Sequence, residues 1–515
     1  NASRWDIFDF STAIPGQIDI RGINGVQLTL EDLAVLSSGV AHVASLPGTS
    51  ANVNITTTAQ WLVGNNMYLG GDDATLGGTG ALVMSSGGTV DAAANTIKIW
   101  DNFTVTVDGG NLTAGTVDVS GALNYVGQTL DLSGPTPDYQ LVLSGGTVTA
   151  PRIVLADGPF AGHGTLAAEV IASSDVTATG DLALGTPNAF DAVQIQGKLA
   201  VGNHNVTIHE QGIAAIDHGV EINGGTLHAP NGMALLAGKG IEGNGAITGR
   251  IFQHGGNNLV ANGPLTLGDA ASPAGYFSDG ELVVNDHTVI LLDANEAVLG
   301  SLTTLGANGV GGQLVAANGV LVDFGKNLTG FGTVESPDDP AAPLTNNGHI
   351  IGNSLIEPIT LIGYVRGVGT LENVVIAGTD APGFSPARVV RGSVVYDGTL
   401  EIEIGGLSPG SEFDQINHLL GAGLAELGGT LDVQLTGGFM PAAGDNFEII
   451  TAADVQGAFA VESLPALDNG LNWIVDYQPT SVSLLVGLPG DFDFDLDVDG
   501  RDFLLWQIDP AVGSL

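Results

Sequence analysis

Acidic residues alternate with apolar ones near the end of the chain, where residues 491–503 read DFDFDLDVDGRDF. Carboxylate oxygens at alternate positions suit a hard cation such as Ca²⁺, and twelve-residue calcium loops use positions 1, 3, 5, 7, 9 and 12. Counting from Asp491 places an aspartate at each of these positions, with a backbone carbonyl as the ligand at position 7. Counting from Asp493 would put Leu504 at position 12, so that register fails. The predicted calcium ligands are Asp491, Asp493, Asp495, Asp497, Asp499 and Asp502.

This aspartate spacing resembles the calcium loop of dockerin modules, in which the twelfth residue is usually Asp. The resemblance implies a helix that begins at Phe503, and a cohesin-like or other cell-surface partner that anchors the chain. The sequence departs from the dockerin pattern at position 4, which is Phe494, and at position 6, where Leu496 replaces the usual Gly. It also contains one such loop where dockerins have two. The alternative interpretation is a solvated acidic tail that binds no metal.

The composition narrows the class of protein. The net charge is −43, with only 12 Lys and Arg among 515 residues, so the chain repels nucleic acid and anionic membranes and attracts cations. The absence of Cys excludes a disulfide scaffold, Cys-based zinc sites and a Cys nucleophile. No apolar run is long enough to span a membrane. Because the sequence starts at Asn1 without Met, we interpret it as a mature exported protein, expected outside the cell on a bacterial surface.

A sequence repeat defines the structural elements that must position this loop. Three segments, about 80 residues apart, each open with Gly-Gly and a short apolar alternation and close with Gly-x-Gly before a branched residue. Such self-similarity at a fixed period is typical of stacked architectures. The three copies are Gly145–Leu166, Gly224–Ile247 and Gly311–Val334.

Between these copies the chain reads as short strands separated by Gly turns. Segments such as Thr96–Trp100, Phe103–Val107 and Thr116–Val119 alternate apolar and polar residues, and no stretch keeps a 3.6-residue period. Asn-Gly turns would also suit antiparallel hairpins, but recurrence of the same turn favours parallel coils of about 22 residues. The predicted fold is all-β, a long parallel β-helix, expected to be right-handed.

Changes of pattern suggest four parts. Residues 1–60 form an aromatic-rich cap with the first coils, or a segment that joins subunits, and residues 61–395 form the repetitive β-helix. Residues 396–488 contain longer, better alternated strands, which suggest a small antiparallel β-sandwich-like domain. Residues 489–515 form the calcium-binding tail.

Two segments late in the predicted β-helix resemble a known group. Gly367-Val368-Gly369-Thr370-Leu371 is followed by Ala381-Pro382-Gly383-Phe384-Ser385-Pro386. The sequence of these two segments is similar to that of the closing coils of autotransporter-like bacterial surface β-helices. The region after it and the aspartate-rich tail resemble modules of exported planctomycete-type proteins. The resemblance implies an extracellular, non-enzymatic role.

Other candidate sites are weaker. His204, His209, His218 and His228 lie close in sequence, and Asp72-Asp73 and Asp338-Asp339 would suit extra calcium sites on turns. Scattered basic residues and the absence of nucleophile and phosphate-loop motifs argue against an enzyme, although paired carboxylates in a groove would suit a glycosidase or lyase.

The leading hypothesis is a structural protein that self-associates into a fibre, surface layer or matrix with calcium-stabilised contacts. The alternative is an adhesin that binds glycans along the solenoid and is anchored through its tail.

Overall fold

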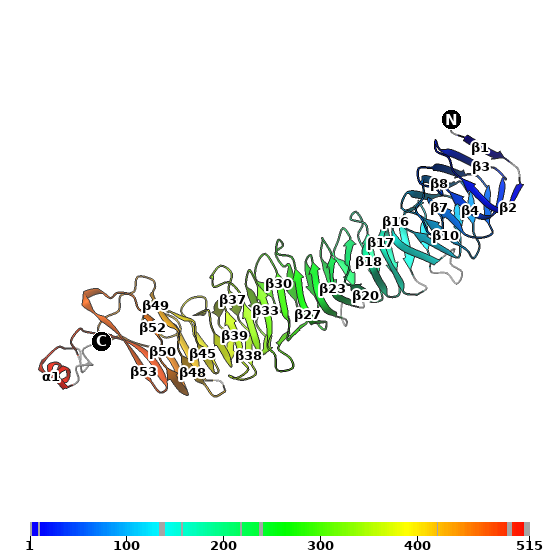
Figure 1. Cartoon of the computed structure of the whole chain (residues 1–515). Helices are drawn as coiled ribbons and strands as arrows, with labels where there is room; N and C mark the ends of the chain where they lie inside the picture. The colour runs from blue at the N-terminus through cyan, green and yellow to red at the C-terminus, as the bar shows by residue number, and fades with distance from the viewer. Residues whose placement is uncertain are drawn as a thin grey trace. The chain divides into compact units, whose positions relative to one another are not determined.

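The computed structural model describes residues 3–8, 11–132, 140–155, 158–216, 219–235, 240–419, 421–491 and 497–508. Strands dominate the described residues, and parallel pairing dominates the strands (Figure 1). The prediction of an all-β parallel β-helix is therefore confirmed. The chain divides into two compact units, Asn1–Phe252 and Gln253–Leu515, which we describe separately.

The first unit consists of short strands that recur coil after coil. Their bounds are β1 (Ser3–Phe8), β2 (Ser11–Ile20), β3 (Val26–Glu31), β4 (Val35–Val43), β5 (Ser50–Ile55), β6 (Gln60–Val63), β7 (Met67–Leu69), β8 (Thr79–Ser85), β9 (Thr89–Asp91), β10 (Thr96–Ile99), β11 (Phe103–Asp108), β12 (Asn111–Thr113), β13 (Thr116–Val119), β14 (Ala122–Val126), β15 (Thr129–Asp131), β16 (Gln140–Leu155), β17 (Phe160–Ala172), β18 (Val176–Gly185), β19 (Val193–Ile195), β20 (Leu199–Gly202), β21 (Asn205–His209), β22 (Ala214–Ile216), β23 (Val220–His228), β24 (Met233–Leu235) and β25 (Ile241–Thr248).

Parallel ladders in this unit run along three faces of the coil. One ladder runs β1–β3–β5–β8–β11–β14, a second β2–β4–β7–β10–β13–β16, and a third β4–β6–β9–β12. Long strands such as β16 and β17 bend around a corner and contribute to two faces, with register shifts at the bend. Each coil therefore hydrogen-bonds to the coils before and after it, as the repeat predicted.

The second unit repeats this plan. β26 (Ile251–Gln253) lies at the division between the units. The strands that follow are β27 (Asn258–Gly268), β28 (Tyr276–Ser278), β29 (Glu281–Asn285), β30 (Thr288–Leu292), β31 (Ala297–Val298), β32 (Leu302–Leu305), β33 (Gly312–Ala316), β34 (Val320–Val322), β35 (Asn327–Gly330), β36 (Gly332–Glu335), β37 (Leu344–Asn346), β38 (His349–Gly352), β39 (Ile359–Ile362), β40 (Tyr364–Gly367), β41 (Thr370–Glu372), β42 (Val374–Ile376), β43 (Thr379–Pro382), β44 (Arg388–Arg391), β45 (Val394–Tyr396), β46 (Thr399–Ile404), β47 (Gln415–His418), β48 (Leu424–Leu427), β49 (Thr430–Leu435), β50 (Asn446–Ala452), β51 (Asp454–Gly457), β52 (Val461–Ser463), β53 (Asn472–Gln478) and β54 (Ser481–Gly487). A short 3₁₀ helix, η1 (Asp468–Gly470), precedes β53, and the α-helix α1 (Gly500–Ile508) follows β54.

The antiparallel pairing predicted for 396–488 occurs only among its last strands, and the sandwich itself stays a prediction. Two parallel ladders continue through this region, β42–β45–β48–β51 and β43–β46–β49–β52. Between the described strands of this region, antiparallel pairing occurs in β50–β54 and β53–β54, at one edge of the sheet β44–β47–β50–β54–β53. The alternation that suggested a sandwich is real, but a strand with one buried face alternates in the same way whichever direction its partner runs.

The core consists of the inward residues of the stacked strands. In β46 the side chains alternate between half-buried and buried, with Leu400, Ile402 and Ile404 fully buried. Burying a Leu or Ile side chain stabilises a fold by roughly 1.5–3 kcal/mol, so these thin layers of aliphatic side chains suffice without many aromatics.

Stacking of glycines between neighbouring coils explains the repeated sequence pattern. In each copy the second Gly of Gly-Gly lies in one coil, and the last Gly of Gly-x-Gly lies beside it in the next coil. A Cβ on the later glycine would lie 2.0–2.3 Å from the carbonyl oxygen of the earlier one, a distance that only Gly avoids. The later glycines also have φ values of +119° to +133°. The stacked pairs are Gly146 and Gly164, Gly225 and Gly245, and Gly312 and Gly332.

Candidate functional site

The predicted calcium loop connects β54 to α1. Asp491, Asp497, Asp499 and Asp502 belong to the described residues, whereas Asp493 and Asp495 lie outside them. The helix begins at Gly500, three residues before the predicted start at Phe503. The structure therefore shows the last half of the predicted loop, residues 497–502, and its exit into a helix.

Three of the predicted ligands converge. The carboxylates of Asp497, Asp499 and Asp502 each offer an oxygen within 4.8 Å of the others. Asp497 and Asp499 are exposed, while Asp502 is 2% exposed and Asp491, at the other end of the loop, is 5% exposed. Among the described residues no other three His, Asp or Glu side chains gather in this way.

Two of these aspartates cap the helix. Oδ1 of Asp499 accepts the N–H of Arg501 at 2.7 Å, and Oδ2 of Asp502 accepts the N–H of Asp499 at 2.7 Å. This reciprocal arrangement is a capping box, which satisfies N–H groups that the first helical turn leaves unpaired. The cap also fixes positions 9 and 12 of the predicted loop beside each other, and a helix N-terminus favours negative charge.

The donor set fits a hard cation. It consists of carboxylate oxygens with no nitrogen or sulfur ligand, and three carboxylates this close repel one another unless a cation lies near them. The helix cap alone would also account for Asp499 and Asp502. The six-residue calcium site therefore stays a prediction.

No family model matches the chain, and no curated protein matches it. The resemblances to dockerin loops and to surface β-helices stay expectations.

The weaker candidates have structural roles. Oδ1 of Asp72 accepts the N–H groups of Ala74 and Thr75 at 2.9 and 2.7 Å, and these bonds lower the pKa of Asp72. Asp338 accepts the N–H of Thr379, and Asp339 accepts that of Ala341. These aspartates therefore stabilise loops.

The described histidine candidates, His204, His209 and His228, do not form a metal-binding cluster. His228 contacts Thr248 through Nδ1 at 2.8 Å, and the residue opposite it on the neighbouring strand is Thr207 rather than His204. His218 lies outside the described residues.

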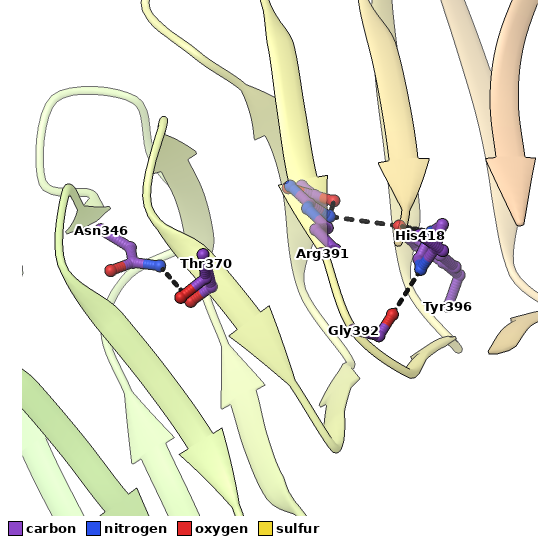
Figure 2. A network of polar contacts seen from close by, with 7 residues as sticks. Asn346, Thr370, Arg391, Gly392, Tyr396 and His418 are labelled. Carbon is purple, nitrogen blue, oxygen red and sulfur yellow. Dashed lines mark hydrogen bonds and ion pairs between the residues drawn. The ribbon is translucent and has the colours of Figure 1, made fainter. Parts of the chain in front are cut away.

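The second unit contains a buried polar network that was not predicted from the sequence. Arg391 on β44 forms an ion pair with Asp380 on β43 through both guanidinium ends, at 2.8 Å for Nη2 and Oδ1. Arg391 Nη1 also donates to the Tyr396 hydroxyl at 3.2 Å. Asp380, Arg391, Tyr396 and His418 are each at most 3% exposed. Figure 2 shows the arginine, tyrosine and histidine side chains in a row across neighbouring strands.

The network fixes the protonation of His418. Its Nδ1 lies 2.6 Å from the carbonyl oxygen of Gly392, so this nitrogen carries the proton and donates it. Its Nε2, 3.1 Å from the Tyr396 hydroxyl, then accepts from Tyr396 (Figure 2). Burial lowers the pKa of His418 to about 4, with a further contribution from the positive charge of Arg391. The imidazole is therefore neutral at physiological pH, and this network links four strands, β43, β44, β45 and β47.

Proposed function

We propose that this protein is an extracellular structural protein of a bacterial cell surface, which assembles by pairing the outermost strands of one copy with those of another. The observation that carries the proposal is the outer edge of β52, the last strand of its parallel ladder in the second unit. The neighbouring strand β51 is partly covered, because the N–H of Val455 donates to Pro479 at 2.8 Å. Among the described residues, β51 pairs only with β48 and β52 only with β49.

These edge strands carry little of the core. All three residues of β52 are exposed, including Val461 at 55%, and in β51 only Val455 is half-buried. An edge strand with unpaired N–H and C=O groups is a template for another strand. In a parallel stack the added strand comes from a different surface of the next copy, and such a head-to-tail contact extends into a filament.

The first unit offers a strand of the right kind. Within the described residues β1 pairs with β3 alone, in parallel register, and Trp5 on β1 is 63% exposed. A strand with one paired edge and an exposed aromatic side chain suits a contact between subunits. This favours the joining role predicted for residues 1–60.

Calcium has a definite part in this proposal. A net charge of −43 on each copy opposes close approach of subunits, and cations held by Asp497, Asp499 and Asp502 would reduce this repulsion near the end of the second unit.

One edge amide permits a sharp test. The N–H of Val461 donates inward to Gly429, so the N–H of the next residue, Glu462, points away from β49. Replacing Glu462 by proline removes this outward donor and leaves the inner ladder intact. We expect the variant to sediment as single chains under conditions in which the native protein forms large assemblies.

The matched control is Glu462→Ala. It removes the contact between the Glu462 carboxylate and the Tyr477 hydroxyl, at 2.8 Å, but keeps the outward N–H. Assembly in the alanine variant and not in the proline variant supports edge pairing. Equal assembly in both would show that subunits join elsewhere.

A further inference from the structure

A pocket opens on the outer surface of the second unit, away from the acidic tail in sequence. It lies over strands β40, β43 and β46 and under the loop at residues 383–387, is partly open to solvent, and has a cavity volume of about 110 Å³. This volume is below the roughly 300–1,000 Å³ of sites that enclose drug-sized ligands, so the hollow has room for part of one small ring and not for a larger ligand. The side chains that decide its chemistry are those of Tyr364, Arg366, Phe384, Glu401 and Glu403.

A small residue creates the hollow. Arg366 pairs with Ala381, and Asp380 pairs with Leu400, so Ala381 lies between Arg366 and Glu401 on the outward face. Two strand spacings of roughly 4.8 Å separate the outer pair by about 10 Å. The methyl group of Ala381 fills little of this gap, and the two long side chains form its walls.

Buried aspartates beneath the pocket hold its floor and its rim in place. Asp380, next to Ala381 on β43, points inward into the ion pair with Arg391. Asp414 accepts the N–H of Ala387 at 2.7 Å and that of Glu403 at 2.8 Å, which ties the loop that carries Phe384 to β46. The pocket is therefore preformed.

An aromatic ring stands at the mouth. Phe384 is 61% exposed, and the guanidinium of Arg366 lies 5.3 Å from its ring centroid. Arg366 is held in turn by Thr345 at 3.2 Å and Glu296 at 4.0 Å. Only 6% of the chain is aromatic, yet Tyr364 and Phe384 meet here. Because Arg366 holds the exposed Phe384 ring in place, a flat apolar surface of a ligand can pack against this ring.

The opposite wall accepts hydrogen bonds. The Tyr364 hydroxyl donates to Glu401 at 3.5 Å, and Glu403 follows two residues later on the same face. Anionic ligands are disfavoured because these carboxylates repel them, and purely apolar ligands would leave the carboxylates unsolvated. A metal ion is disfavoured because, among the described residues, only the aspartates of the tail bring three ligand oxygens within 4.8 Å.

We propose that this pocket binds one neutral pyranose residue of a surface glycan, with the sugar ring against Phe384 and its hydroxyls donating to Glu401 and Glu403. A pyranose matches the site because it combines an apolar C–H face with several hydroxyl donors. The site makes the assembled protein a glycan-binding surface, and binding does not depend on assembly.

The experiment probes an array of neutral, acidic and amino glycans with the full-length chain, then measures affinity for the best neutral glycan by titration calorimetry. We expect Phe384→Ala to weaken binding about tenfold or more, and Glu401→Gln to weaken it less. The matched control is Phe324→Ala, because Phe324 is 87% exposed at a distant turn. Thermal melting verifies that each variant is folded.

Four outcomes decide the proposal. Neutral glycan binding that is lost in Phe384→Ala and kept in Phe324→Ala supports it. Binding to no glycan, or binding that Phe384→Ala leaves unchanged, overturns it. Binding only to amino sugars or polyamines also overturns it, because the site would then recognise cations. The Glu462→Pro variant separates this question from assembly, since single chains should bind the glycan with unchanged affinity.

Discussion

At the scale of single residues, the described core of the second unit contains a buried ion pair. Asp380 and Arg391 lie in the interior because each neutralises the other, whereas breaking such a pair typically costs about 3–5 kcal/mol. The pairing of Asp380 with Arg391 was not predictable from the sequence. Both residues stand beside apolar neighbours, and only the burial pattern of β43 and β44 in the folded chain shows that both point inward.

His418 makes stability depend on pH. The pKa of the His418 imidazole is about 4 in the folded protein and 6.5 in the unfolded chain. Between these two pH values the imidazole is therefore protonated in the unfolded chain and neutral in the folded protein. We expect the free energy of unfolding to be constant from this group above pH 6.5, and to fall by about 3 kcal/mol between pH 6.5 and pH 4. Urea denaturation across this range measures it.

The His418→Asn variant is the test of that assignment. It should be less stable at neutral pH, because hydrogen bonds to Gly392 or Tyr396 are lost, but its stability should fall less between pH 6.5 and pH 4. His349→Asn, at an exposed histidine, serves as the control and should keep the native slope. An unchanged slope in His418→Asn would show that other groups cause the acid sensitivity.

At the scale of elements, glycine stacks hold the coils at their spacing. Gly363, Gly378, Gly398 and Gly429 follow one another on successive coils, and a Cβ on Gly429 would lie 1.8 Å from the carbonyl oxygen of Gly398. We expect Gly429→Ala to lower the free energy of unfolding by about 1–3 kcal/mol because the backbone must move. Gly255→Ala, whose Cβ would find its nearest neighbour at 3.7 Å, should cost little. Thermal melting of both variants measures the difference, and equal costs would contradict the packing argument.

The helix cap and the calcium site can be separated at Asp499. Asparagine caps a helix about as well as aspartate, but it lacks the charge that a hard cation needs. We expect Asp499→Asn to weaken calcium binding at least severalfold in titration calorimetry while helix α1 persists. Calcium binding that is unaffected by the substitution would mean that this carboxylate only caps the helix.

Element positions were largely predictable. Phe103–Val107 is β11 but for one residue, and Thr116–Val119 is β13, because alternation and Gly turns mark strand ends directly. Partner direction was not predictable in 396–488, since alternation records burial and not the direction of the neighbour. The pocket was not predictable either, because it depends on which residue lies opposite Ala381 one coil away.

At the scale of the whole molecule, the net negative charge of the sequence explains why assembly would require interactions that overcome electrostatic repulsion. Each copy carries 55 acidic and 12 basic residues, so copies repel one another at low ionic strength. In the proposed assembly, edge strands such as β52 would supply the attraction through backbone hydrogen bonds, and cations at the tail aspartates would reduce the repulsion. None of the helices among the described residues has the length and apolar content to cross a membrane.

Electron microscopy of the purified full-length protein at neutral pH, with millimolar calcium and then with a chelator, tests the central claim most directly. The account predicts regular filaments or sheets in calcium that dissolve when the chelator is added. Assemblies that persist in chelator would contradict the calcium contribution and leave the edge strands as the joint. Single particles under every condition would contradict the structural function itself.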